Sequence, residues 1–192
     1  MRAVRNQYTG RMVDKNLNTA GLGTGTRRMT ACVALGTATV PLDTAVNVSF
    51  PHITGTFGVP VDSIQWIIIA YVLTYAALLL GAGRFADVFG YRRMFITGLV
   101  INGLAMYGCA SAQTFDALVL ARIGQGFGAA LILSAGPALI TLSAPDSKRT
   151  QMIGTYTIAF GLAGASGPLI GGMMIDWLGW SGVFWFRIPI VL

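Results

Sequence analysis

The sequence has 192 residues, of which 54% are hydrophobic and 10% are charged, with a formal net charge of +6. Globular domains carry about 25% charged residues, so this composition excludes an ordinary soluble domain. A mean hydropathy of +0.66 excludes disorder as well, because disordered segments combine low hydrophobicity with high charge. The 25 glycines are typical of membrane helices, in which small residues let neighbouring backbones approach each other. We therefore expect an all-α membrane protein with several spans.

Apolar runs of about 20 residues, the length that a membrane helix needs, occur five times. Residues 1–28 are polar and show no apolar periodicity, so we interpret them as a cytoplasmic tail. The predicted spans are 29–50, 64–83, 94–112, 118–142 and 152–175, and a sixth apolar run covers 183–192. This last run would reach about half-way across the hydrocarbon core. Residues 29–192 are thus expected to form one helical bundle with five complete spans and a partial sixth.

The basic residues predict the orientation of the bundle in the membrane. The N-terminal segment and the loops after the second and fourth spans hold 11 of the 13 lysines and arginines, and the opposite loops hold none. Positive charge accumulates on the cytoplasmic side, so the N-terminus is expected in the cytoplasm, with the chain in the lipid bilayer of a plasma (bacterial inner) membrane. These positions follow the topology and not a groove, so no nucleic-acid partner is expected.

The first span contains a carboxylate. Asp43 lies one helical turn from Asn47, so both are predicted on one face of the helix. A charge inside a membrane helix costs about 3 kcal/mol on insertion scales and marks a proton or substrate path in many membrane proteins. The alternative is a static carboxylate that local hydroxyl groups, such as those of Thr39 and Thr44, satisfy.

Arg122 and Gln125 share one face of the fourth span. Measured from the outer ends of their spans, Arg122 is expected about 8 Å deep and Asp43 about 12 Å deep. A buried arginine and a buried aspartate at similar depth compensate part of each other's desolvation, and protonation of the aspartate would open the pair. A static structural ion pair is the alternative interpretation.

Two further segments contain paired glycines. Gly83 and Gly90 bound a predicted cytoplasmic turn, in which Asp87 lies near Arg92 and Arg93. In the fifth span, Pro168 removes a backbone donor and is predicted to kink the helix. The glycines around it are predicted to give a smooth packing face: Gly167, Gly171 and Gly172. A generic glycine-rich packing helix is the alternative for this span.

Other polar residues within the spans are candidates for a cavity lining that suits many amphipathic molecules. They are Asn47, Tyr71, Tyr75, Asn102, Gln125 and Tyr156. The sequence shows no residues at metal-ligand spacing, no phosphate-binding loop and no nucleophile–base pair. We therefore expect no metal, no cofactor and no enzymatic activity.

These clusters, in this order and spacing, resemble the major facilitator superfamily, and most nearly its fourteen-helix drug:proton antiporters. The resemblance covers residues from about 29 to 192 and implies an N-terminal helical bundle of that family. It rests on four motifs: the first-helix motif at 42–51, motif A at 83–95, motif B at 118–130 and the antiporter motif C at 167–172.

The resemblance also implies roles for residues. Asp43 would take the proton and Arg122 would couple to it. Asp87, with Arg92 and Arg93, would lock helices together at the cytoplasmic side. Gly167 and Pro168 would belong to the interface between two transporter halves.

The chain departs from the family pattern at three positions that concern charge. Val88 and Tyr91 stand where basic residues are usual, so the charge network of motif A is thinner. Arg187 stands where asparagine is usual, which places an additional charge in the membrane.

Two functions remain open at this point. In the first, the chain is the N-terminal half of an exporter that exchanges amphipathic or cationic organic compounds for protons. In the second, it is a truncated, transport-incompetent half that serves as a structural or assembly subunit of a larger membrane complex. The second follows from the number of spans, because alternating access needs two halves that rock against each other. A homodimer that imitates the two halves is a weaker option.

Overall fold

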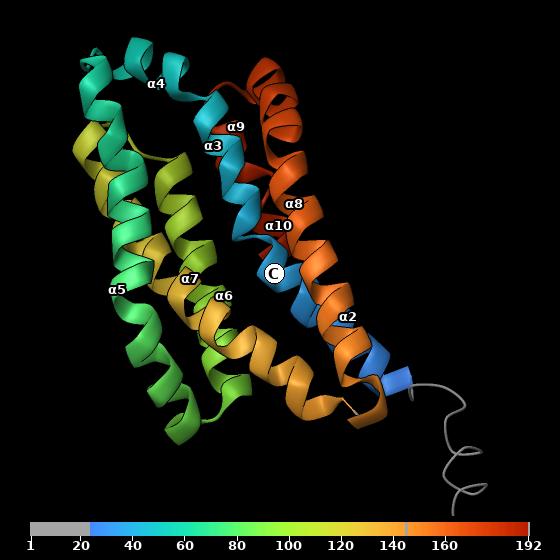
Figure 1. The fold of residues 1–192 in the computed structure, drawn as a ribbon. Helices are drawn as coiled ribbons and strands as arrows, with labels where there is room; N and C mark the ends of the chain where they lie inside the picture. Colours follow the sequence, from blue (N-terminus) through green and yellow to red (C-terminus); the bar gives the residue numbers. More distant parts are fainter. Residues whose placement is uncertain (1–23, 145, 192) are drawn as a thin grey trace, which may run out of the picture.

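The computed structural model describes residues 24–144 and 146–191 (Figure 1). Five helical stretches in this part of the chain are long and apolar enough to cross a membrane, and no strand occurs in it. They are Arg28–Val48, Val61–Phe89, Tyr91–Ala110, Phe115–Ser143 and Asp146–Leu178. The expected all-α membrane bundle is confirmed. Most of the predicted cytoplasmic tail lies outside the described residues.

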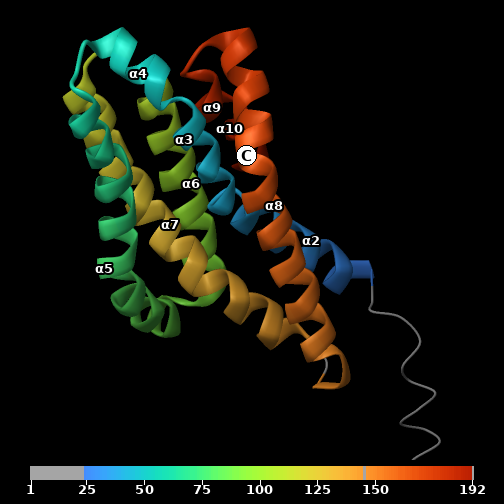
Figure 2. The same cartoon turned by 45° about the horizontal axis from the view of Figure 1, so that its top comes forward.

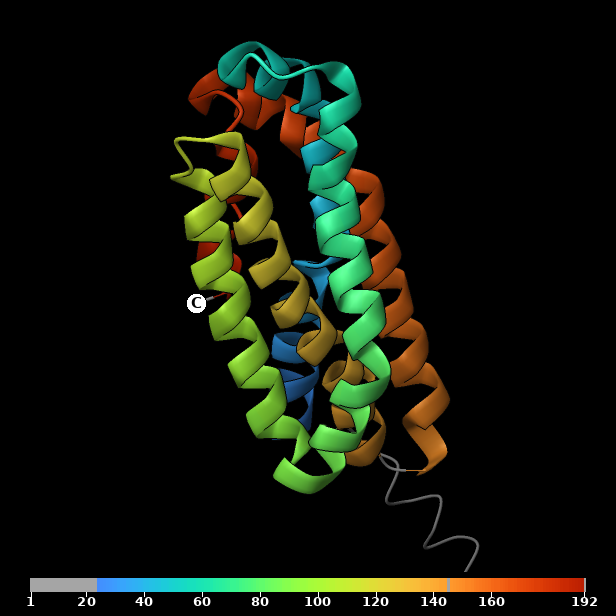
Figure 3. The ribbon, with the colours of Figure 1, turned by 90° about the vertical axis from the view of Figure 1, so that its left-hand side faces the viewer.

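The helices form two groups, which lie side by side in Figure 1 and one in front of the other in Figure 3. The first group contains α5 (Gln65–Phe89), α6 (Tyr91–Ala110) and α7 (Phe115–Ser143), with α7 packed against both others. The second group contains the first span and α8 (Arg149–Leu178). Helix α4 (Phe50–Phe57) connects the groups at one end of the bundle (Figure 2).

The first span is not the continuous helix that we predicted over 29–50. Because Pro41 has no backbone N–H, the helical pattern is interrupted there. The amides of Val40 and Asp43 donate to carbonyl groups three residues back, each at 3.1 Å, so Asp43 lies in a tightened turn. The span consists of α2 (Thr24–Ala38), the 3-10 helix η1 (Pro41–Thr44) and α3 (Ala45–Val48). Helix α2 also begins inside the range that we predicted as tail.

The sixth apolar run is likewise interrupted. We predicted one partial helix over 183–192, but the structure has α9 (Gly182–Trp185) and α10 (Ile188–Val191), with Arg187 between them. Pro189 cannot donate the hydrogen bond that would continue the helix from Trp185. Both short helices pack against α6.

The predicted cytoplasmic turn is shorter than expected. Gly83 lies inside α5, so its prediction as one end of the turn was wrong; the apolar helix simply continues to Phe89. The chain reverses at Gly90, whose φ of +91° favours glycine. The hydroxyl of Tyr91 donates to Asp87 across this turn. Arg92 and Arg93 are exposed, and in the part of the chain that the structure describes they form no ion pair with Asp87.

Glycines let α8 approach the first span closely. A Cβ atom on Gly167 would overlap the hydroxyl of Thr44, and one on Gly171 would lie 2.8 Å from the carbonyl oxygen of Ala45. Gly172, the next residue, has no such neighbour within 4 Å. The packing of α8 against η1 and α3 therefore requires glycine at the first two positions and tolerates a side chain at the third.

This difference between neighbouring glycines is testable. We expect Gly171→Ala to destabilise the bundle by about 1–3 kcal/mol, because the new methyl group meets backbone atoms that cannot move aside cheaply. Gly172→Ala is the matched control and should be neutral or slightly stabilising, because alanine favours the helix. Thermal unfolding of both variants in detergent measures the effect. Equal unfolding temperatures for the two variants would contradict the close packing at Gly171.

Candidate functional site

Three charged side chains meet between the two groups of helices, and we call Asp43, Arg122 and Arg187 the ion cluster. Arg122 donates to both carboxylate oxygens of Asp43, from Nη1 to Oδ1 at 2.7 Å and from Nη2 to Oδ2 at 2.6 Å. Arg187 donates from Nη1 to Oδ1 at 2.8 Å. The side chains of Arg122 and Arg187 are 1% and 0% exposed, and that of Asp43 is 11% exposed. The structure thus brings together the predicted pair and adds a third charge.

Neighbouring groups on α5 and α7 hold Arg122 in place. Gln125 accepts from Arg122 Nη1 at 2.6 Å and donates from Nε2 to Asp43 Oδ1 at 3.1 Å. The Nε of Arg122 donates to the carbonyl of Ile67 at 3.0 Å. The guanidinium also lies 4.3 Å from the ring centroid of Tyr71, a cation–π contact. Together these contacts fix the orientation in which Arg122 donates to both carboxylate oxygens of Asp43.

Our prediction of the site did not include Arg187, although the sequence carried a signal for it. The residue is a charge in an apolar run, at a position where asparagine is usual in the resembling family. It reaches Asp43 because the interruption between α9 and α10 places it beside η1. Its Nε donates to the carbonyl of Val183 at 3.0 Å, whereas its Nη2 is buried without a hydrogen-bond partner among the described residues.

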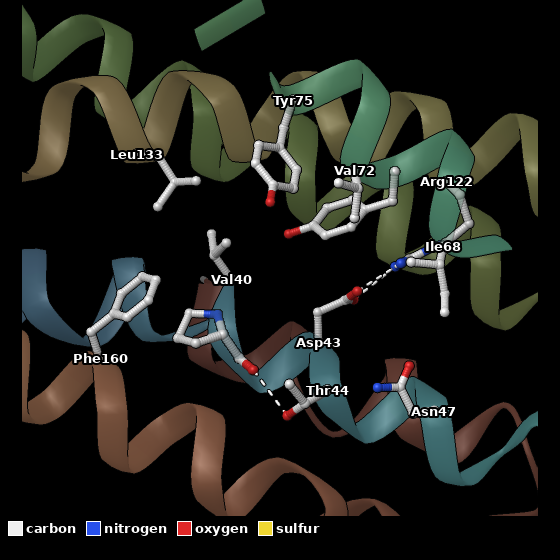
Figure 4. A pocket seen from close by; sticks show the side chains of 12 residues that line it. Val40, Asp43, Thr44, Asn47, Ile68, Val72, Tyr75, Arg122, Leu133 and Phe160 are labelled. Atoms are coloured by element: carbon white, nitrogen blue, oxygen red, sulfur yellow. Dashed lines mark hydrogen bonds and ion pairs between the residues drawn. The ribbon is translucent and has the colours of Figure 1, made fainter. Parts of the chain in front are cut away.

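A cavity of about 270 Å³ opens beside Asp43 (Figure 4). Its polar lining comprises Asp43, Thr44, Asn47, Tyr71, Tyr75 and Arg122. Its apolar lining comprises Val40, Pro41, Ile68, Val72, Leu133 and Phe160. Figure 4 shows the side chains of Tyr75 and Asp43 pointing into this space from opposite helices. A titratable carboxylate and an apolar surface thus line the same cavity.

Three predicted cavity residues lie elsewhere. Gln125 belongs to the ion cluster's surroundings and does not line the cavity. Asn102 is buried in the contact of α6 with α7, where a Cβ on Gly128 would lie 2.6 Å from its backbone nitrogen, so α7 covers it. Tyr156 lines a separate cavity of about 250 Å³ with Pro137 and other residues of α7 and α8. Of the predicted cavity residues, Asn47, Tyr71 and Tyr75 therefore line the cavity beside Asp43, whereas Tyr156 lines a different one.

Comparison with known proteins identifies the family. The family model described as Major Facilitator Superfamily matches residues 29–192. The chain belongs to the major facilitator superfamily. This match covers the whole bundle, including the ion cluster and the cavity beside it.

Relatives within this superfamily carry names that describe resistance and export. The methylenomycin A resistance protein of Bacillus subtilis (strain 168) is 34% identical over 82% of this chain and 34% of its own length. The cephamycin export protein CmcT of Amycolatopsis lactamdurans is 36% identical over 79% of this chain and 32% of its own length. The multidrug resistance protein Stp of Mycobacterium tuberculosis (strain CDC 1551 / Oshkosh) is 32% identical over 76% and 27%. The chain spans about a third of the length of these curated relatives.

The ion cluster predicts a strong energetic coupling between Asp43 and Arg187. Asp43→Asn should destabilise the protein by about 3 kcal/mol or more, because it leaves two buried guanidinium groups without a counter-charge. Adding Arg187→Gln to Asp43→Asn should recover part of this loss, because the double variant leaves only Arg122 without a counter-charge. Thermal and denaturant unfolding of the two single variants and the double variant measures the coupling. Strictly additive losses of unfolding free energy would show that the Asp43–Arg187 contact makes no net contribution to stability.

Proposed function

We propose that the protein that carries this chain is a proton-coupled exporter of amphipathic organic compounds. We place it in a bacterial plasma membrane with its N-terminus in the cytoplasm. Membership of a transporter superfamily and the names of the relatives support export. The observation that carries the proton-coupling part is a part-buried carboxylate, Asp43, that lies between two guanidinium groups and lines a partly apolar cavity.

In this proposal Asp43 binds the proton. Its carboxylate is the most exposed member of the ion cluster and lines the cavity, which gives a proton or a substrate a route to it. Protonation removes the charge that compensates Arg122 and Arg187 while both are still buried. Since an uncompensated buried charge is strongly unfavourable, a guanidinium group must then move to water or to another acceptor. Arg122 is carried by α7 and Arg187 lies between α9 and α10, so this movement would change the cavity wall.

Two surfaces are assigned in this proposal to contacts with the second half of a transporter. The first is the cytoplasmic turn, where Arg92 and Arg93 are exposed and available for acceptors on another helix. The second is the outward face of α8, where Pro168 is exposed and Gly172 has open space beside it. Gly167, by contrast, lies inside the bundle in contact with the first span and does not belong to this outward face.

The alternative, a structural or assembly subunit, uses the same outward face of α8 for another membrane protein. Large apolar side chains on this helix are exposed, with Leu162 at 65%, Leu169 at 72% and Trp177 at 73%. The intact mass of the native polypeptide extracted from membranes separates the two functions. We expect a mass between two and three times the 20.3 kDa of this chain, because 82% of this chain matches 34% of the length of the first relative. A mass near 20.3 kDa with a stoichiometric partner would favour the subunit instead.

Replacing Asp43 with asparagine tests the exporter proposal directly. In membrane vesicles, Asp43→Asn should reduce efflux driven by a pH gradient to the background of vesicles without the protein. Exchange of labelled for unlabelled substrate across the same membrane should persist, because it does not require release of a proton. The substrate is a compound to which the gene confers resistance in growth assays.

Asp62→Asn is the matched control, because Asp62 is exposed at the end of the bundle before α5. This variant should retain efflux driven by the gradient. Undiminished gradient-driven efflux in Asp43→Asn would exclude Asp43 as the proton-binding group. Loss of exchange together with efflux would assign Asp43 a structural role only.

A further inference from the structure

The ion cluster is not electrically neutral. Asp43 supplies one negative charge, whereas Arg122 and Arg187 supply two positive charges. In the described ranges 24–144 and 146–191, the two arginines form ion pairs with Asp43 alone. Buried charges in proteins are paired, because desolvation of an isolated ion is very unfavourable. One buried positive charge therefore has no counter-ion within this bundle.

Unused hydrogen-bond donors lie in the same region. The hydroxyl of Tyr71 is buried without a hydrogen-bond partner among the residues that the structure describes, and Tyr71 lines the cavity. The ring of Tyr75 lies 5.3 Å from that of Tyr71, and its hydroxyl points into the same space (Figure 4). The Nη2 of Arg187 is a second buried donor that has no partner among the described residues. Buried donors without partners are rare, so an acceptor oxygen of a ligand in the cavity would complete the hydrogen bonding of Tyr71.

We propose that the cavity selects amphipathic anions, with Arg187 as the residue that supplies the selecting charge. A carboxylate or similar oxyanion would accept a hydrogen bond from Tyr71 and balance the unmatched charge of the cluster. Its hydrocarbon or aromatic part would pack on the apolar lining that Leu133 and Phe160 contribute. The inference rests on the proposed function, which takes this cavity as the substrate site. It narrows the proposed amphipathic substrates to anions.

Arg187 is the decisive residue in this argument, although it does not line the cavity. Without its charge, Asp43 and Arg122 would form a neutral pair, and the site would have no electrostatic preference for an anion. The side chain of Arg187 is 0% exposed and contacts Asp43, which lines the cavity, so water screens its charge less than that of a surface arginine. It is therefore a specificity-determining residue that acts through the field of the cluster.

Three naphthalene derivatives of nearly equal size test this inference: 1-naphthoate, its neutral analogue 1-naphthamide and the cation 1-naphthylmethylammonium. The native polypeptide is purified from membranes into lipid nanodiscs, and the affinity of each probe is measured by calorimetry at neutral pH. We expect 1-naphthoate to bind at least about tenfold more tightly than 1-naphthamide. The cation should bind most weakly of the three.

Variants of the cluster should shift this preference in opposite directions. Arg187→Gln makes the cluster neutral and should remove the preference for 1-naphthoate over 1-naphthamide. Asp43→Asn adds a further unmatched charge and should increase the preference, whereas a purely structural role would weaken the binding of all probes in both variants. Arg149→Gln is the matched control, because Arg149 is an exposed arginine outside the cavity, and it should change nothing.

Several results would overturn the inference. They are equal binding of the three probes, a preference for the cation, and no measurable binding of 1-naphthoate to the unaltered protein. A shift of the preference in the same direction for Arg187→Gln and Asp43→Asn would also overturn it. The comparison of the three probes on the unaltered protein holds even if a variant does not fold. Gradient-driven efflux tests proton coupling separately, so either proposal can fail while the other stands.

Discussion

The contact of one carboxylate with two guanidinium groups inside a membrane bundle is the interaction on which the rest of this structure depends. Asp43 lies on the first span, Arg122 on α7 and Arg187 between α9 and α10. In an apolar environment none of these charges is stable alone, so the ion pairs between them hold the three segments together. The cluster thereby joins the two groups of helices at the wall of the cavity.

Interrupted helices make this contact possible. Pro41 tightens the turn that carries Asp43, and Pro189 interrupts the segment that carries Arg187. The freed backbone would be unfavourable in contact with lipid, but here it is enclosed by neighbouring helices. Gly167 and Gly171 let α8 cover η1 and α3 at backbone distance. The two interruptions and the glycine face are therefore parts of one construction around Asp43.

The same construction explains why the cluster suits a transporter. A fully neutral and fully paired cluster would have one stable arrangement, whereas this cluster has one positive charge in excess and one Arg187 donor without a partner among the described residues. Binding of a proton or of an anion changes its charge balance, and the arginines that respond are attached to different helices. A ligand can shift a conformational equilibrium only through such differences in interaction between states. The chain belongs to a superfamily in which two halves move around a central site, and in the proposed function this bundle would provide one wall of such a site.

Composition and periodicity alone determined the class of this protein, because a membrane helix needs a long apolar run and charges are rare within it. They also marked Asp43 and Arg122, since the two charges stand out in apolar spans at similar predicted depth. Only the tertiary structure decided that Arg187 joins them, because proline interruptions set its position and no helical periodicity could reveal it. The same holds for Asn102, a polar residue that the close contact of α6 with α7 removes from the cavity. Local sequence specifies helices and their apolar faces, whereas partners 79 and 144 residues away from Asp43 are specified by the packing of whole helices.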